Sequence, residues 1–379
     1  MTWLKNTGLL LGILVYRLFR VSWFSSNSPG IKTVVFIQQA KLGDMVCTTP
    51  MFKAVKLKYP QAKVIVVGNK VNQYLLTGHS DVDEYVVFSG LLNLVTFLRT
   101  RKIDFGCIVG PDFFGLAALL LGNVDLITAP RVINNNSPYE TIWYKLLCLF
   151  IKTKTHDFYG YAPREYLRLL EVINVFSDDT KKTLFYSKEA NYKMAEFFAG
   201  IGVTSDDILV GISPSAGNKV KKWSSAKFAK VAEHLVKKDR VKIFVIGSQD
   251  DLGDAIEVCS FVEGEKTKIF NVAGHFSLEE LKCFISKLQL FISVDTGPIY
   301  IAEAFGVPTI DIIGPVDERV QPPVGKKHKL VLPERDKAEL FIMDARSFDP
   351  KEARRQIESI TAEEVVEVAD DLLRDLFSI

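Results

Sequence analysis

From residue 31 onward, short runs of apolar, often β-branched residues alternate with stretches whose apolar positions recur at helical spacing. The runs in the first half are KTVVFI, AKVIVVG, DEYVVF, DFGCIVG and VDLITA, and residues 51–59 and 91–99 are helical stretches between them. Strands that alternate with helices are typical of a parallel sheet with helices on both faces. The pattern therefore predicts an α/β unit in this half.

The second half repeats this alternation. Its apolar runs are DILVGIS, VKIFVIG, TKIFNVAG, LQLFISVD and VPTIDIIG, with helical spacing over residues 225–237 and 278–287. A last amphipathic helix is expected over residues 361–377. A second parallel α/β unit follows from this pattern.

A helical segment at residues 163–174 and a polar stretch through Lys182 separate the two halves, so we place the boundary within residues 165–190. We expect two facing Rossmann-like domains, residues 31–180 and 181–379. Domains of this kind bind ligands at the carboxyl ends of their strands, here in an interdomain cleft.

Composition fits this picture and excludes little. The chain has 379 residues, 48% of them hydrophobic and 24% charged, which suits a globular protein of two domains. A net charge of +2 does not indicate a nucleic-acid binder. The five cysteines lack CxxC spacing and are expected to be buried thiols, with neither disulfide nor zinc: Cys47, Cys107, Cys148, Cys259 and Cys283.

Residues 1–30 differ from the rest of the chain. The stretch GLLLGILVYRLFRVSWF (8–24) is apolar and aromatic, but Arg17 and Arg20 interrupt it before the roughly 20 residues that a membrane span needs. We therefore expect residues 5–24 to form an amphipathic helix that lies on an anionic membrane surface. A signal peptide and a helix docked on the protein's own core are the alternatives.

Several enzyme classes lack their motifs. No GxGxxG follows the first strand, and GISPSAGNK does not have P-loop spacing. HExxH and GxSxG are also missing from the sequence, and the five histidines lie far apart. This argues against a nicotinamide dehydrogenase, a P-loop NTPase, a metal centre and a serine hydrolase.

The first candidate loop is QQAKLGDMV, which follows the first strand. Gly43 permits a tight turn, and Asp44 then lies at the start of a helix, at the carboxyl end of the sheet. Asp44 is either a catalytic carboxylate or a helix cap, and this loop alone leaves both roles open.

The second loop, SPSAGNKVKKW, follows the first strand of the second half. Ser213, Ser215 and Gly217 offer hydroxyls and accessible backbone N–H groups, while Lys221 and its neighbouring lysines supply positive charge. Such a loop can bind a diphosphate without a metal. The alternative is a solvated lysine cluster around Trp223, with the indole packed in the core.

The third loop is SVDTGPIYIAEAF. After the strand, Asp295 and Thr296 turn the chain, Gly297 frees the backbone, and Pro298 starts a helix at a position that needs no N–H. The amides near Thr296 and Gly297, together with the helix dipole, would form an anion site facing Lys221.

Taken together, these loops resemble glycosyltransferase family 9, the ADP-heptose:lipopolysaccharide heptosyltransferases. QQAKLGDMVCTTPMFKAVKLKYP is similar to the family's opening Leu-Gly-Asp pattern, GISPSAGNKVKKWSS to its Lys-x-Trp segment, and SVDTGP to its Asp-Thr-Gly-Pro motif. The resemblance extends from Ile31 to the C-terminal helix.

The resemblance implies a GT-B fold and an inverting, metal-independent transfer of heptose or a related sugar. The donor would be an ADP-sugar bound by residues 181–379, and the acceptor a lipopolysaccharide core or similar glycolipid bound by residues 31–180. No cofactor is implied. The enzyme would be cytoplasmic and peripheral on the cytoplasmic face of the inner membrane.

The resemblance also implies residue roles. Asp44 would be the general base, and Lys221 would stabilise the leaving diphosphate. The ribose would be bound by Asp251 first and Asp250 second, and Lys41 and Gly43 would lie on the acceptor side. The remaining donor and phosphate contacts would come from Ser215, Gly217, Asp295, Thr296, Gly297 and Pro298.

Two departures from the family pattern bear on the donor. Tyr300 stands where the family often has His, and Lys41 stands where Ser is more usual. Two other functions share this architecture: a nucleotide-sugar 2-epimerase, which would gather histidines near the loops, and a non-catalytic nucleotide-sugar or glycolipid-binding relative, which would lack Asp44 or the diphosphate site.

Overall fold

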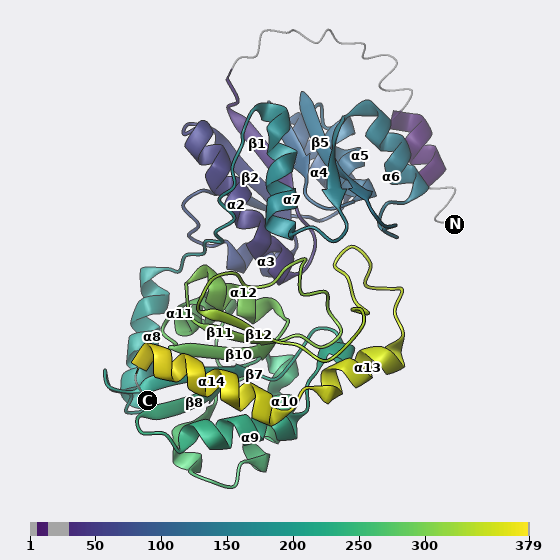
Figure 1. Cartoon of the computed structure of the whole chain (residues 1–379). Helices are drawn as coiled ribbons and strands as arrows, with labels where there is room; N and C mark the ends of the chain where they lie inside the picture. Colours follow the sequence, from purple (N-terminus) through teal and green to yellow (C-terminus); the bar gives the residue numbers. More distant parts are fainter. Residues whose placement is uncertain (1–5, 14–29, 378–379) are drawn as a thin grey trace. The chain divides into compact units, whose positions relative to one another are not determined.

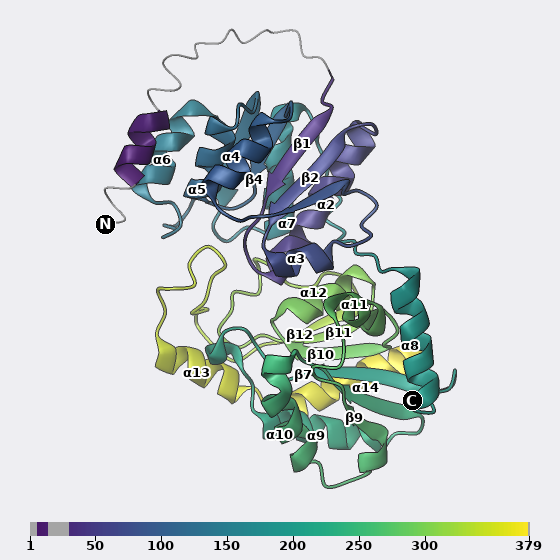
Figure 2. The ribbon, with the colours of Figure 1, turned by 180° about the vertical axis from the view of Figure 1, so that it is seen from behind.

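A computed structural model describes residues 6–13 and 30–377. The chain divides into two compact units, Met1–Lys181 and Lys182–Ile379, and each is described here by itself. In each unit a six-stranded parallel sheet is covered by helices (Figures 1 and 2). The predicted α/β architecture with two parallel sheets is therefore confirmed.

The sheet of the N-terminal unit has the order β3-β2-β1-β4-β5-β6. Its strands are β1 Thr33–Ile37, β2 Lys63–Gly68, β3 Glu84–Val87, β4 Phe105–Ile108, β5 Leu126–Ile133 and β6 Lys152–Asp157. The apolar pattern predicts the first five strands. It misses β6, because KTKTHD pairs only with β5 at the edge of the sheet and keeps mostly polar, exposed side chains.

The helices of this unit are α2 Leu42–Lys58, α3 Lys70–Leu75, α4 Leu91–Arg99, α5 Phe113–Leu121, α6 Ile142–Leu147, η1 Cys148–Phe150, α7 Ala162–Arg168 and η2 Leu169–Ile173. The helical stretch expected over residues 51–59 is the second half of α2, which starts beside Asp44 as predicted and runs through Pro50. Pro50 cannot donate to the carbonyl of Val46. The Thr49 hydroxyl donates to that oxygen instead, at 2.8 Å, so the helix continues.

The sheet of the C-terminal unit has the order β12-β11-β10-β7-β8-β9. Its strands are β7 Ile208–Ser213, β8 Val241–Val245, β9 Ile269–Asn271, β10 Leu290–Val294, β11 Thr309–Ile312 and β12 His328–Val331. The pattern misses only β12, a short edge strand with charged residues.

The longer helices of this unit are α8 Lys188–Gly200, α9 Ser225–Val236, α10 Leu252–Phe261, α11 Leu278–Ser286, α12 Gly297–Ala304, α13 Pro350–Ser359 and α14 Ala362–Phe377. Short 3₁₀ turns are η3 Lys219–Lys221, η4 Gln249–Asp251 and η5 Lys266–Lys268. Trp223 is a core residue: its ring packs on Phe228, and its indole N–H donates to the carbonyl of Ile360 at 2.9 Å. The predicted helices at 225–237, 278–287 and 361–377 correspond to α9, α11 and α14.

The cysteines are free thiols, as predicted. Cys47, Cys107, Cys148 and Cys283 are buried and Cys259 is partly buried. Burial raises the pKa of the Cys107 thiol well above its ordinary value.

Residues 6–13 form a helix whose Leu10 and Ile13 are buried in the core shared by α4, α5 and α6. This contact fits the docked alternative for these residues. Lys5 and residues 14–24, which complete the predicted membrane segment, lie outside the described residues. Among the helices that the structure describes, none has the length and apolarity to cross a membrane.

Candidate active site

All three predicted loops follow strands at which the order of a sheet reverses. In the N-terminal unit, β1 lies between β2 and β4, and in the C-terminal unit β7 and β10 are neighbours. Adjacent helices leave opposite faces of the sheet at such a point, so the carboxyl ends of these strands are open to ligands. The sheet topology thus brings the second and third loops together.

Asp44 is the third residue of α2, and its Oδ2 accepts a hydrogen bond from the backbone N–H of Lys41 at 3.1 Å. The carboxylate therefore caps the helix, as one of the two open roles requires, yet the residue is only partly buried. Gly43 is buried in the same turn and Lys41 is exposed beside it. A carboxylate in the first turn is also favoured by the helix dipole.

The loop in front of Asp44 is held by amide side chains. Gln38 Oε1 accepts from the N–H of Ala40 at 3.2 Å, and the Ala40 carbonyl accepts from Asn69 and Asn72 at 2.8 and 3.1 Å. Gly68 at the end of β2 has no room for a Cβ, which would lie 2.8 Å from the Gln38 carbonyl. No sequence pattern indicates these supports, because Asn69 and Asn72 come from the segment after β2.

Tyr166 of α7 is the buried neighbour of this site. The helix α7 packs on α2, and the Tyr166 side chain is almost completely buried. Burial raises the pKa of the Tyr166 phenol, and the negative charge of Asp44 raises it further. Asp44 therefore faces a neutral phenol.

In the C-terminal unit, Lys221 and Asp295 meet. Lys221 Nζ lies 2.7 Å from Asp295 Oδ2 and also donates to the Asp295 carbonyl, although the two residues are 74 positions apart. The Tyr300 hydroxyl donates to the other carboxylate oxygen of Asp295. The side chains of Lys221 and Asp295 are 20% and 11% exposed, so the pair is accessible at its cationic end.

Thr296, Gly297 and Pro298 start α12 as predicted. Thr296 is the extended N-cap residue, and Gly297 and Pro298 are the first two helical positions. All three are partly exposed, and they follow Asp295 directly. The helix N-terminus and the ammonium group of Lys221 thus lie next to each other, a favourable arrangement for an anion.

The second loop is fixed by a carboxylate that the sequence analysis did not identify. Asp254 in the first turn of α10 accepts from the Ser215 hydroxyl at 3.0 Å and pairs with Lys222. Ser215 is buried and uses its hydroxyl on Asp254, while Gly217 is exposed. Ser215 therefore positions the loop through its bond to Asp254.

Asp251 and Asp250 differ in their surroundings. Asp251 Oδ2 accepts from the Ser248 N–H at 2.9 Å and from the Ser248 hydroxyl at 2.6 Å, which is the capping alternative that the sequence left open. Asp250 is exposed in the same turn.

A buried polar layer lies beneath Asp295. Asp311 of β11, in register with Ser293, is completely buried, and neither of its carboxyl oxygens has a hydrogen-bond partner within the described chain. Burial raises the pKa of Asp311 well above its ordinary value, and the charge of Asp295 adds to this, whereas Lys221 opposes it. Beside it, Lys182 and Glu303 form a buried ion pair at 2.7 Å.

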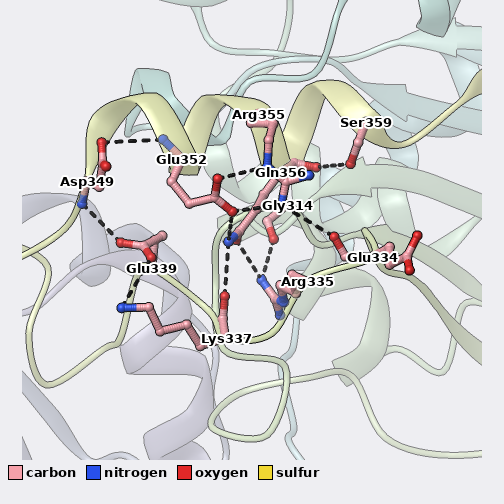
Figure 3. A network of polar contacts seen from close by, with 10 residues as sticks. All are labelled: Gly314, Glu334, Arg335, Lys337, Glu339, Asp349, Glu352, Arg355, Gln356 and Ser359. Atoms are coloured by element: carbon pink, nitrogen blue, oxygen red, sulfur yellow. Dashed lines mark hydrogen bonds and ion pairs between the residues drawn. The ribbon is translucent and has the colours of Figure 1, made fainter.

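The chain after β11 is held by Arg335 (Figure 3). Its guanidinium donates to the carbonyls of Gly314 and Val316, the latter at 2.8 Å, and pairs with Glu318. Gln356 of α13 contacts the same guanidinium at 3.3 Å. The segment next to the carboxyl end of β10 is therefore rigidly supported from within its own unit.

Comparisons with known proteins bear on the family and the fold. A model of glycosyltransferase family 9 (heptosyltransferase) matches residues 162–346. The chain is 27% identical over 289 residues to lipopolysaccharide heptosyltransferase 3 of Escherichia coli (strain K12). This alignment covers 73% of this chain and 80% of the relative.

Two solved structures show the same fold. The glycosyl transferase family 9 protein from Veillonella parvula DSM 2008 matches with a TM-score of 0.76 at 20% identity. The match covers 92% of this chain and 99% of the solved chain. The E. coli ADP-heptose LPS heptosyltransferase II has a TM-score of 0.73 at 18% identity, with 91% and 99% covered.

The chain has the fold of these solved structures, the predicted GT-B architecture, and the family match over residues 162–346 together with the relatives supports glycosyltransferase activity. It is similar to the heptosyltransferases of glycosyltransferase family 9, in line with the resemblance carried by the three loops.

Proposed function

We propose that the protein transfers a heptose, or a related sugar, from an ADP-sugar to a lipopolysaccharide core or similar glycolipid. The observation that carries the proposal is the meeting of Lys221, Asp295 and the N-terminus of α12 at the point where the C-terminal sheet reverses its order. The similarity to lipopolysaccharide heptosyltransferases supports the sugar and the acceptor.

In this proposal the acceptor hydroxyl attacks the anomeric carbon of the donor and inverts it. The new C–O bond forms as the bond to the diphosphate breaks, and Asp44 takes the hydroxyl proton. A positioned carboxylate contributes typically about 10² to 10⁴ in rate. Asp44 suits this role because Lys41 N–H and the helix N-terminus fix its orientation.

The leaving diphosphate gains negative charge as the bond breaks. Lys221 and the backbone N–H groups near Thr296 and Gly297 are the groups that stabilise this charge in our proposal. Lys221 is paired with Asp295 in the structure, so it turns toward the diphosphate while Tyr300 keeps its hydrogen bond to Asp295. No metal is needed in this scheme, since a cation and a helix terminus supply the positive charge.

The other predicted residues take supporting places. Gly217 and the backbone at Ser215 line the phosphate side, and Pro298 fixes the start of α12. Asp250, which is exposed, is the better candidate for the ribose because Asp251 is already engaged with Ser248.

We also infer that the enzyme works at the cytoplasmic face of the inner membrane, held there by the residues of segment 5–24 other than Leu10 and Ile13, which are buried in the core. The support is the basic, apolar sequence of that segment and the lipid nature of the proposed acceptor. This inference is tested by comparing the membrane partitioning of the full chain with that of a chain lacking residues 1–26. Unchanged partitioning would show that these residues do not anchor the protein.

The function is tested by calorimetric titration in EDTA with ADP, UDP, GDP and CMP. We expect micromolar binding of ADP alone, and a Kd at least about tenfold higher for Lys221→Ala, because a hydrogen bond to a charged group contributes about 1.5–3 kcal/mol. Lys219→Ala is the matched control, since this lysine lies exposed in the same turn. A preference for UDP would move the donor, and no binding of any nucleotide would refute the proposal.

A further inference from the structure

The helix α6 and the turn η1 that follows it carry apolar side chains on both faces. Tyr144, Leu147 and Cys148 point inward and are buried in the core. On the other side, Ile142 is 60% exposed and Leu149 is 74% exposed. A helix that is apolar all round is normally buried on all sides, which this one is not.

The exposed Ile142 and Leu149 lie on one side of this segment. Leu146, which is partly buried and packs against the core, falls between them at spacings of four and three residues. Phe150, 40% exposed, extends this side by one residue. We call these four residues the outer stripe of α6.

The basic residues near the outer stripe are lysines, while Glu140, which precedes it, is buried and Glu171 pairs with Lys154. Residues 141–156 contain Lys145, Lys152 and Lys154 and no carboxylate. Lys145 is only loosely paired, at 3.8 Å from Glu140, and Lys152 is exposed. An apolar stripe edged by lysines complements an anionic lipid surface, where each Lys near the headgroups contributes about 1 kcal/mol.

The helix α6 also adjoins the N-terminal helix of residues 6–13. Both views of the ribbon show the helix of residues 6–13 beside α6 (Figures 1 and 2), and its Leu10 and Ile13 enter the same core. Leu11 of that helix is 56% exposed. Residues 1–43 contain no carboxylate at all, so the whole N-terminal segment shares the basic, apolar character of α6.

We propose that the outer stripe of α6, together with Leu11, is a second membrane-contact surface, which dips into the headgroup boundary of an anionic bilayer while Lys145 and Lys152 meet the lipid phosphates. The inference deepens the proposed function, because it says how a unit that carries Asp44 is held at the lipid surface where its acceptor resides. A second copy of the chain is the poorer occupant, since pairing two such stripes places lysines against lysines with no carboxylate from residues 141–156 between them.

The test is co-sedimentation of the full chain with vesicles of phosphatidylethanolamine and phosphatidylglycerol. Leu149→Gln should lower the partition coefficient about tenfold, from the apolar burial that one leucine loses. Leu57→Gln is the matched control, because Leu57 is 71% exposed at the end of α2, outside the α4–α6 core, and should change nothing. Lys152→Glu should weaken binding to these vesicles but not to phosphatidylcholine.

Equal binding by Leu149→Gln, Leu57→Gln and the parent protein would overturn the inference. So would a dimer of the parent chain in gel filtration that Leu149→Gln converts to monomer, since the stripe would then be a protein interface. Calorimetry with ADP separates this inference from the proposed function. Leu149→Gln should bind ADP as the parent protein does. If the parent protein failed to bind ADP, the proposed transferase function would be refuted, and the vesicle experiment alone would decide whether the outer stripe contacts membranes.

Discussion

Tyr300 is the residue whose replacement tests the donor site most directly. Its hydroxyl donates to Asp295, and the same carboxylate pairs with Lys221 at 2.7 Å. When Lys221 turns to a diphosphate, Asp295 keeps only the tyrosine as a close donor. Tyr300→Phe therefore makes the departure of Lys221 more costly and should weaken nucleotide binding.

The size of the effect follows from the bond that is lost. A hydrogen bond to a charged group contributes about 1.5–3 kcal/mol, and about 1.4 kcal/mol corresponds to a tenfold change in Kd. The hydrogen bond between Tyr300 and Asp295 is also present without ligand, so only part of its free energy changes the affinity. We therefore expect the Kd for ADP to rise about tenfold. Tyr300→His, which restores the family's more usual residue, should lie closer to the parent protein than Tyr300→Phe.

The assay is calorimetric titration with ADP, run beside thermal unfolding. Tyr144→Phe is the control, because it removes another buried tyrosine bond, to the Pro130 carbonyl at 2.7 Å, in the other unit. It should cost stability, about 1 kcal/mol, without changing the Kd. An unchanged Kd in Tyr300→Phe, or an equal change in Tyr144→Phe, would refute the reasoning.

Three further predictions follow from the buried and catalytic charges. Lys182→Met leaves Glu303 buried without its cation and should lower the free energy of unfolding in urea by about 3–5 kcal/mol. Adding Glu303→Gln should recover most of this loss. A loss below about 1 kcal/mol in Lys182→Met would contradict the prediction. Asp311 has a folded-state pKa raised above its ordinary 3.8, so the folded protein loses stability as pH rises above about 4. Asp311→Asn should thus stabilise the protein increasingly between pH 4 and 8 in thermal scans, and a pH-independent difference would argue against a buried proton. Asp44→Asn should lower kcat about 10²- to 10⁴-fold with donor affinity unchanged, whereas near-normal turnover would remove Asp44 from the role of base.

The sequence predicts most of the fold because buried parallel strands are nearly continuous apolar runs. It misses β6 and β12, since edge strands pair on one side only and tolerate KTKTHD and HKLV. The start of α2 beside Asp44 agrees with the sequence, but only the contact of the Thr49 hydroxyl with the Val46 carbonyl shows how the helix continues through Pro50.

The candidate site shows a similar limit. The motifs place Lys221, Asp295 and Thr296 at strand ends, and the topology then brings these together. Asp254 and the partner of Tyr300 could not be predicted, because contacts between side chains on different elements leave no periodic signal. An aspartate inside the run VPTIDIIG was a visible signal for Asp311, since an unpaired carboxyl in a buried strand is costly.

The contact between Lys221 and Asp295 has a consequence for selectivity. A lysine that already holds a carboxylate is a poor target for chloride or a single phosphate, because such an anion must compete with a built-in rival. A ligand with two adjoining phosphoryl groups can contact Lys221 and the N-terminus of α12 at the same time. These two contacts together can displace Asp295 from Lys221. The site would thus bind a diphosphate in preference to small anions such as chloride or a single phosphate.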